Sequence, residues 1–220
     1  VSNAVNQFVQ NFRTAANPQI IKMVAAGEYN GSKQLLLMST KLAYYLMLMV
    51  AIPVIILAEP LLKLWLVKIP DYLIEFVQWT MVQNLFSVFD ISLYTAIYAK
   101  GRMRENAILG PNSNLLILLA VYILFCQGYS PIVLCYAFTF MAFFNGLIEK
   151  PFILCRYIGY NVNEIVRIVY RCMLVTILAI PIPYLLGTYM DIFQIRGFIL
   201  VCMGSVLSVV IASYMTGFSH

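Results

Sequence analysis

The chain has 220 residues, of which 62% are hydrophobic and 10% are charged, and its formal net charge is +5. Soluble domains carry about 25% charged residues, so this composition excludes an ordinary soluble domain and indicates a polytopic membrane protein. We expect an all-α fold, because in the bilayer core each backbone group must be satisfied inside its own helix. The net positive charge does not indicate a nucleic-acid partner, because its distribution follows the membrane spans.

The predicted elements begin with the end of a span in residues 1–17, which is too polar to face lipid on all sides. A polar connection is predicted over residues 18–33. Residues 59–71 are predicted to lie at the membrane interface, and residues 150–163 to form a further connection. A helical span needs about 20 apolar residues. Six complete spans are predicted, over residues 34–58, 72–98, 107–126, 131–149, 164–187 and 197–216.

The start of the chain and its charge pattern bear on its organisation. The chain begins at Val1, without methionine and inside a helical pattern, so we expect a piece of a longer protein. We expect residues 1–163 to form the core spans and residues 164–220 the final helical hairpin.

Eleven of the fourteen lysines and arginines fall on one side of the predicted spans. The positive-inside rule places that side, with the C-terminus, in the cytoplasm.

Asp90 is the sharpest single signal, because it lies deep in the predicted span over residues 72–98. A carboxylate at bilayer depth costs about 2.5–3.5 kcal/mol even on the insertion scale, so it is expected to face protein or a wet cavity. Tyr94 shares its helical face, and Asn84 flanks that face. The functional interpretation is a site for cation or proton coupling, or a contact to a sugar. The alternative is a hydrogen-bonded side chain that only fixes helix packing.

A polar stripe near the start of the chain is the second candidate site. Asn6, Gln10, Arg13 and Asn17 follow the spacing i, i+4, i+7, i+11 of one helical face. Such a stripe on a membrane helix must face a cavity or partner helices. Amides suit sugar hydroxyls, and a guanidinium binds phosphate with two parallel hydrogen bonds. The alternative for Arg13 is that it marks the cytoplasmic end of its span.

Other polar residues give weaker signals. Asn145 and Glu149 share a helical face, but Lys150 and Pro151 follow at once, so the pattern favours the end of a span over a site. The basic turn over residues 100–105 favours a topology signal, with attraction of lipid headgroups or of a pyrophosphate as the alternative.

The cysteine and histidine content argues against metal and catalytic chemistry. The five cysteines show no ligand spacing, and His220 is the only histidine. The sequence also has no glycine-rich phosphate loop. We therefore expect no enzymatic activity, no metal and no cofactor.

Two blocks of sequence resemble a known family. The first comprises residues 17–22 (NPQIIK), residues 25–29 (AAGEY) and residues 39–41 (STK); the second comprises residues 51–53 (AIP), 59–66 (EPLLKLWL) and 69–72 (IPDY). Together they resemble the C-terminal half of bacterial polysaccharide flippases. That family belongs to the same superfamily as multidrug and toxic-compound extrusion transporters and the lipid II flippase.

The resemblance implies a fold and a function. It implies the C-terminal lobe of a two-lobed transporter, about six complete transmembrane helices plus part of another, whose partner lobe is the missing N-terminal half. It implies that undecaprenyl-pyrophosphate-linked oligosaccharide crosses the bacterial inner membrane for O-antigen, capsule or exopolysaccharide synthesis. The partners are then the lipid bilayer and the lipid-linked oligosaccharide, and proton or sodium coupling through Asp90 is a further hypothesis.

Three alternatives stay open at the level of sequence. A cation-coupled multidrug exporter of the same superfamily does not need the amide stripe. A membrane glycan polymerase or ligase predicts a large periplasmic loop, whereas the outer loops here are short. A structural scaffold subunit predicts that Asp90 and Arg13 can be replaced without consequence.

Overall fold

A computed structural model describes residue 7 and residues 16–217 of the chain. Every regular element among these residues is helical, which confirms the expected all-α class. A helical segment over residues 16–25 precedes the named elements. These are α2 (Tyr29–Ile56), α3 (Ala58–Lys63), α4 (Leu73–Ala99), α5 (Met103–Cys126), α6 (Val133–Phe144), η1 (Asn145–Glu149), α7 (Lys150–Ile153), η2 (Leu154–Ile158), α8 (Val162–Ala179), α9 (Pro181–Tyr189), α10 (Ile195–Ala212) and η3 (Ser213–Gly217).

Five helices within the described residues are long and apolar enough to cross a membrane, as in a multi-pass membrane protein. They are Tyr29–Ile56, Asn106–Cys126, Val133–Ile158, Val162–Tyr189 and Ile195–Thr216. The sixth predicted span corresponds to α4, whose 27 residues are enough for a crossing. Helix α4 is not among the five candidate spans, so the count of six spans stays a prediction.

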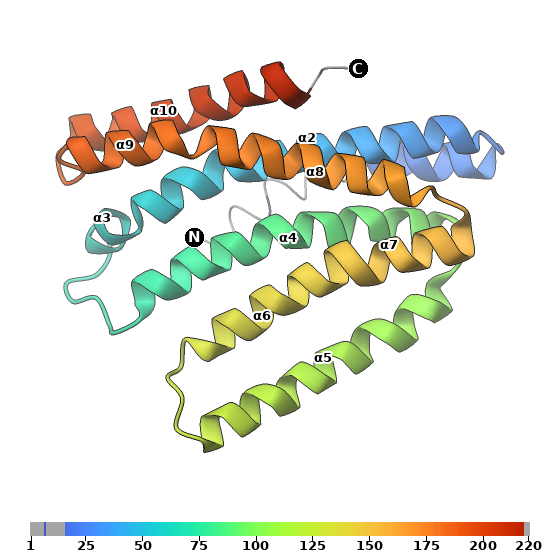
Figure 1. Ribbon diagram of the computed structural model, residues 1–220, viewed down its shortest axis with the longest axis horizontal. Helices are drawn as coiled ribbons and strands as arrows, with labels where there is room; N and C mark the ends of the chain where they lie inside the picture. Colours follow the sequence, from blue (N-terminus) through green and yellow to red (C-terminus); the bar gives the residue numbers. More distant parts are fainter. Residues whose placement is uncertain (1–6, 8–15, 218–220) are drawn as a thin grey trace.

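Helix α4 lies inside the bundle (Figure 1). It packs against α2 on one side and against α6 on the other, with α5 beyond α6 and with α8, α9 and α10 beyond α2. Edge-on aromatic pairs hold α6 along α4: Trp79 with Tyr136 at 4.8 Å between ring centroids, and Phe86 with Phe143 at 5.4 Å. Protein therefore surrounds much of α4, and this explains how α4 can carry several polar side chains in so apolar a protein.

The larger hydrophobic core joins α2 and α4 to the final helices. Tyr44, Met47 and Phe89 are among its most buried residues, together with Cys172 and Val209 of α8 and α10. The Tyr44 hydroxyl also lies 2.9 Å from Thr176 Oγ1, which links α2 to α8 by a hydrogen bond. Helices α8 and α10 thus share a core with α2, and the division of the chain at residues 163 and 164 stays a prediction.

The predicted connection over residues 18–33 is wrong in extent. Residues 16–25 are helical, and α2 begins at Tyr29. Gly27, at φ +81°, ends that segment: its N–H donates to Val24 O and the next N–H donates to Met23 O. This is a Schellman turn, and it shortens the connection to a few residues.

The predicted connection over residues 150–163 is also wrong in extent. One continuous helix runs over Val133–Ile158, through α6, η1, α7 and η2, and ends at Gly159 with φ +87°. Lys150 was assigned to a connection because it is charged and precedes a proline. It instead lies inside this helix with its side chain 5% exposed, because carboxylates neutralise it there.

Tyr160 follows this helix, outside the candidate spans, and gives a test of the local packing. Burial, and to a lesser extent the carboxylate of Glu164, raises its pKa to about 12. The phenol of an unfolded chain titrates near about pH 10. Tyr160 therefore contributes stability that is fully present below about pH 10 and is lost as the pH rises through about 12.

We expect an ultraviolet titration to place this ionisation near pH 12, as the difference between the wild type and Tyr160→Phe. Ionisation of this phenol near its unfolded value of about pH 10 would contradict the packing of Tyr160.

Candidate functional site

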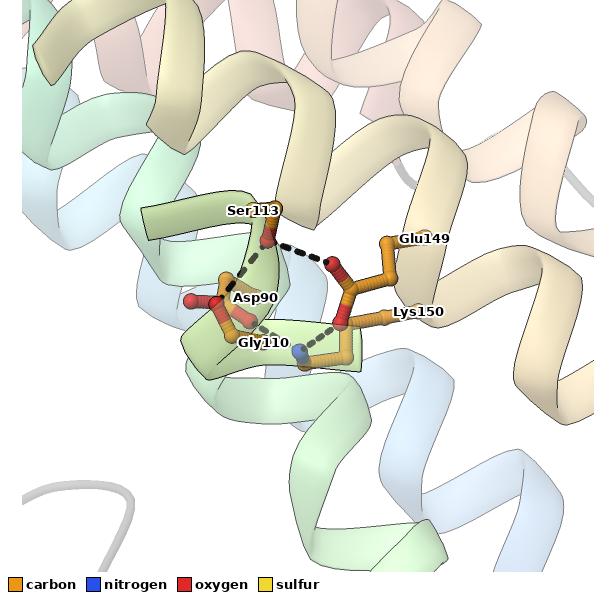
Figure 2. A network of polar contacts seen from close by, with 5 residues as sticks. All are labelled: Asp90, Gly110, Ser113, Glu149 and Lys150. Carbon is orange, nitrogen blue, oxygen red and sulfur yellow. Dashed lines mark hydrogen bonds and ion pairs between the residues drawn. The ribbon is translucent and has the colours of Figure 1, made fainter. Parts of the chain in front are cut away.

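A network of polar side chains joins three helices of the bundle (Figure 2). Lys150 Nζ lies 3.3 Å from Asp90 Oδ1 of α4 and 3.0 Å from Glu149 Oε1. The Ser113 hydroxyl of α5 lies 3.3 Å from Glu149 Oε2 and 2.9 Å from the carbonyl oxygen of Gly110, so its single proton can be donated to either. The side chains of Lys150 and Glu149 are 5% and 4% exposed, whereas that of Asp90 is 28% exposed. The network is thus closed on the side of Glu149 and open at Asp90.

The local helix geometry positions the ion pair. In η1 the turn is widened, and the N–H of Lys150 donates to the carbonyl of Asn145, five residues earlier. Such π-helical turns insert one residue into a helix and occur frequently at functional sites. Pro151 follows directly and supplies no N–H for the next turn. The inserted residue changes the register of the helix just where Glu149 and Lys150 meet Asp90.

Gly146 brings this helix close to α4. A Cβ at this position would lie 2.8 Å from the carbonyl oxygen of Phe86 and 3.2 Å from the backbone N of Asp90. Real Cβ atoms essentially never approach a backbone atom as closely as 2.8 Å, so a larger residue would push the two helices apart. Glycine is therefore required for the close approach that lets Lys150 reach Asp90.

The open side of the network borders a pocket of about 370 Å³ between α4, α5 and the Val133–Ile158 helix, which we call the polar pocket. Its lining residues are Asp90, Ile91, Tyr94, Asn106, Ala107, Gly110, Pro111, Asn114, Asn145 and Lys150. The Oδ1 atoms of Asn106 and Asn145 are buried and accept no hydrogen bond from the described residues. Charged, amide and phenol groups thus meet in one pocket of an otherwise apolar protein.

The structure brings only some of the predicted site residues together. Asp90 and Tyr94 both line the polar pocket. Asn84 is buried elsewhere on α4, with 6% exposure, and is not part of the lining. Asn17 Oδ1 accepts a hydrogen bond of 3.2 Å from Thr95 Oγ1, so Asn17 contacts another face of α4. The remaining members of the stripe, Asn6, Gln10 and Arg13, lie outside the described residues.

The partners of Asp90 were not predicted from the sequence. Asn145 and Glu149 were assigned to the end of a span and Lys150 to a connection, yet all three are buried and lie in one helix. One signal was available, because Asn145 and Glu149 share a helical face with spacing i, i+4. The adjacent lysine and proline outweighed that signal, since both are common where spans end. Asn106 and Ser113 of α5 carried no pattern that pointed to a site.

The described residues show no group of three or more His, Cys, Asp or Glu side chains arranged to hold a metal ion. Any ion in the polar pocket would therefore need amide or backbone oxygens in addition to carboxylates. Such oxygen ligands are present there, in Asn106, Asn145 and the backbone of α5.

The comparisons with known proteins do not assign the chain to a family: no family model matches, and no curated protein and no solved structure is significantly similar. The function is therefore inferred from the site itself and from the resemblance of the two sequence blocks.

Proposed function

We propose that the chain is part of a transporter that moves lipid-linked oligosaccharide across the bacterial inner membrane, for the synthesis of O-antigen, capsule or exopolysaccharide. The observation that carries the proposal is the polar pocket with its buried ion pair inside a bundle of membrane-length helices. Buried charges in such a setting are costly and mark substrate or ion pathways by default. The resemblance of residues 17–72 to polysaccharide flippases supplies the substrate class.

In this proposal the chain acts as one lobe and encloses a cavity together with a second, N-terminal lobe. The sugar hydroxyls pass through the polar cavity while the polyprenyl tail stays in the membrane. The amide stripe that includes Asn17 contacts the glycan, and Arg13 contacts the pyrophosphate, because a guanidinium suits phosphate oxygens. Asp90 couples transport to a proton or sodium gradient. The C-terminus lies in the cytoplasm, as the distribution of Lys and Arg favours.

A genetic experiment tests the proposal. The natural gene that encodes this chain is deleted in its host, and both surface polysaccharide and lipid-linked intermediate are measured on gels. We expect surface glycan to be lost and the intermediate to accumulate, with the wild-type gene restoring both. Complementation with Arg13→Ala at matched protein level tests the pyrophosphate contact and is expected to restore surface glycan only in part.

Two results would reject the proposal. Normal surface glycan in the deletion strain would remove the flippase function and favour a drug exporter, which a gain in drug sensitivity would then show. Loss of glycan without accumulation of the lipid-linked unit would instead indicate a polymerase or ligase step.

A further inference from the structure

Lys150 sits between two carboxylates that differ in exposure (Figure 2). Its Nζ lies 3.3 Å from Asp90 Oδ1 and 3.0 Å from Glu149 Oε1. The Glu149 side chain is 4% exposed, whereas Asp90 is 28% exposed and lines the polar pocket. Lys150 therefore has one enclosed partner and one partner that a solute in the pocket can reach.

The polar pocket also holds oxygen atoms that lack donors. Asn145 is 8% exposed, and its Oδ1, like that of Asn106, accepts no hydrogen bond from the described residues. The carbonyl of Ala107 lacks the usual i+4 donor, because Pro111 has no N–H. The side-chain oxygens of Asn106 and Asn145 are buried, and buried acceptors without a donor are rare and call for an explanation. Carboxylate, amide and backbone oxygens together are the ligands that hard cations prefer.

We propose that Lys150 is an exchangeable counter-ion of Asp90. A monovalent metal cation that enters the polar pocket takes the place of the ammonium at Asp90, and Lys150 stays paired with Glu149. The oxygens of Asn106, Asn145 and Ala107 complete the coordination of the cation. This inference rests on the proposed function in one respect, which is the coupling role of Asp90. It adds that the coupling cation binds at Asp90 and that Lys150 competes with it.

The geometry makes this exchange feasible because it leaves no buried charge alone. Breaking a buried ion pair is costly when one charge stays buried without compensation. Lys150 keeps Glu149, and Glu149 keeps the hydrogen bond from Ser113 at 3.3 Å, whichever cation faces Asp90. Asp90 in turn exchanges one positive charge for another. The ammonium of Lys150 thus stays paired with Glu149 whether or not it also contacts Asp90.

Sodium binding by the purified full-length protein tests the proposal. Thermal stability in detergent is measured at fixed pH against sodium chloride, with choline chloride holding the ionic strength constant. We expect sodium to stabilise the wild type and Asp90→Asn to abolish the effect. In Lys150→Gln the apparent affinity for sodium is expected to rise roughly tenfold, because the fraction of sites free of the competing ammonium rises.

Three further variants serve as a control, as an alternative to Lys150→Gln and as a test of one amide ligand. Lys63→Gln removes a surface lysine that pairs with Glu59 at 2.7 Å, and it is expected to leave sodium affinity unchanged. Should Lys150→Gln fail to fold, Lys150→Arg replaces it: a guanidinium grips carboxylates more firmly than an ammonium, so sodium affinity is expected to fall. Asn145→Leu is expected to weaken sodium binding without removing a charge.

The proposal is overturned if the wild type shows no sodium-specific stabilisation, or if Lys150→Gln and Lys150→Arg bind sodium as the wild type does. These measurements of sodium-dependent stability do not depend on which glycan is transported. A strain that exports glycan normally without the gene would reject the proposed substrate and leave sodium exchange standing. The absence of sodium binding alongside lost glycan export would reject the exchange alone.

Discussion

Replacing Lys150 by methionine is expected to lower the free energy of unfolding by about 3–5 kcal/mol, which is the usual cost of leaving one member of a buried ion pair without its partner. The charge left behind is that of Glu149, whose side chain is 4% exposed. The measurement is unfolding of the purified protein in detergent, followed by circular dichroism at matched ionic strength.

The double variant Glu149→Gln/Lys150→Met removes both charges of the enclosed pair and is expected to recover most of the lost stability. A coupling free energy between the two positions then follows from the double-mutant cycle. Lys63→Met provides the control, because Lys63 and Glu59 are 52% and 45% exposed. Such an exposed pair contributes about 0–1 kcal/mol. A cost for Lys150→Met as small as that of Lys63→Met would contradict the enclosed ion pair.

Gly146→Ala is expected to destabilise the protein by about 1–3 kcal/mol, which is the usual cost of adding a group to a well-packed contact. The added Cβ would lie 2.8 Å from the carbonyl oxygen of Phe86, and a backbone atom cannot move aside as the end of a side chain can. The Val133–Ile158 helix would have to move away from α4. Thermal unfolding in detergent measures the loss.

Gly110→Ala is the matched control for this prediction. Gly110 is also a helical glycine at the site, but its Cβ would lie 3.9 Å from Glu149 Oε1, an ordinary contact. Alanine favours helices over glycine by about 1 kcal/mol, so Gly110→Ala is expected to be neutral or stabilising. If Gly146→Ala were equally neutral, the close approach of the two helices at Asp90 would be wrong.

Much of the fold could be predicted because apolar length is a local property. The spans that correspond to α2, α5, α10 and the Val162–Tyr189 helix followed from long, mostly apolar runs, and their ends shifted by only a few residues. The connections were predicted less well. A helix that passes through a charged residue, as at Lys150, depends on carboxylates supplied by other elements, and the sequence of that segment does not contain this information.

The candidate site was predicted in part for the same reason. Asp90 was identified as a candidate because a carboxylate within an apolar run is costly to bury, whichever face of the helix it occupies. Its partner Lys150 lies 60 residues away, and its register depends on the widened turn of η1. Asn84 was placed near Asp90 from helical spacing, but the face it occupies is covered by other helices. Whether a polar residue meets a pocket is decided by packing between helices.

The role of Asp90 in transport is tested by replacing Asp90 with asparagine in the natural gene and measuring the ratio of surface glycan to lipid-linked intermediate at matched protein level. The exposed Asp71, in the loop before α4, supplies the control variant Asp71→Asn. We expect this ratio to fall well below that of the wild type, because the loss of coupling slows translocation while the lipid-linked unit is still made. We also expect a normal ratio for Asp71→Asn. An unchanged ratio in Asp90→Asn would show that Asp90 does not couple transport and that the polar pocket serves only helix packing.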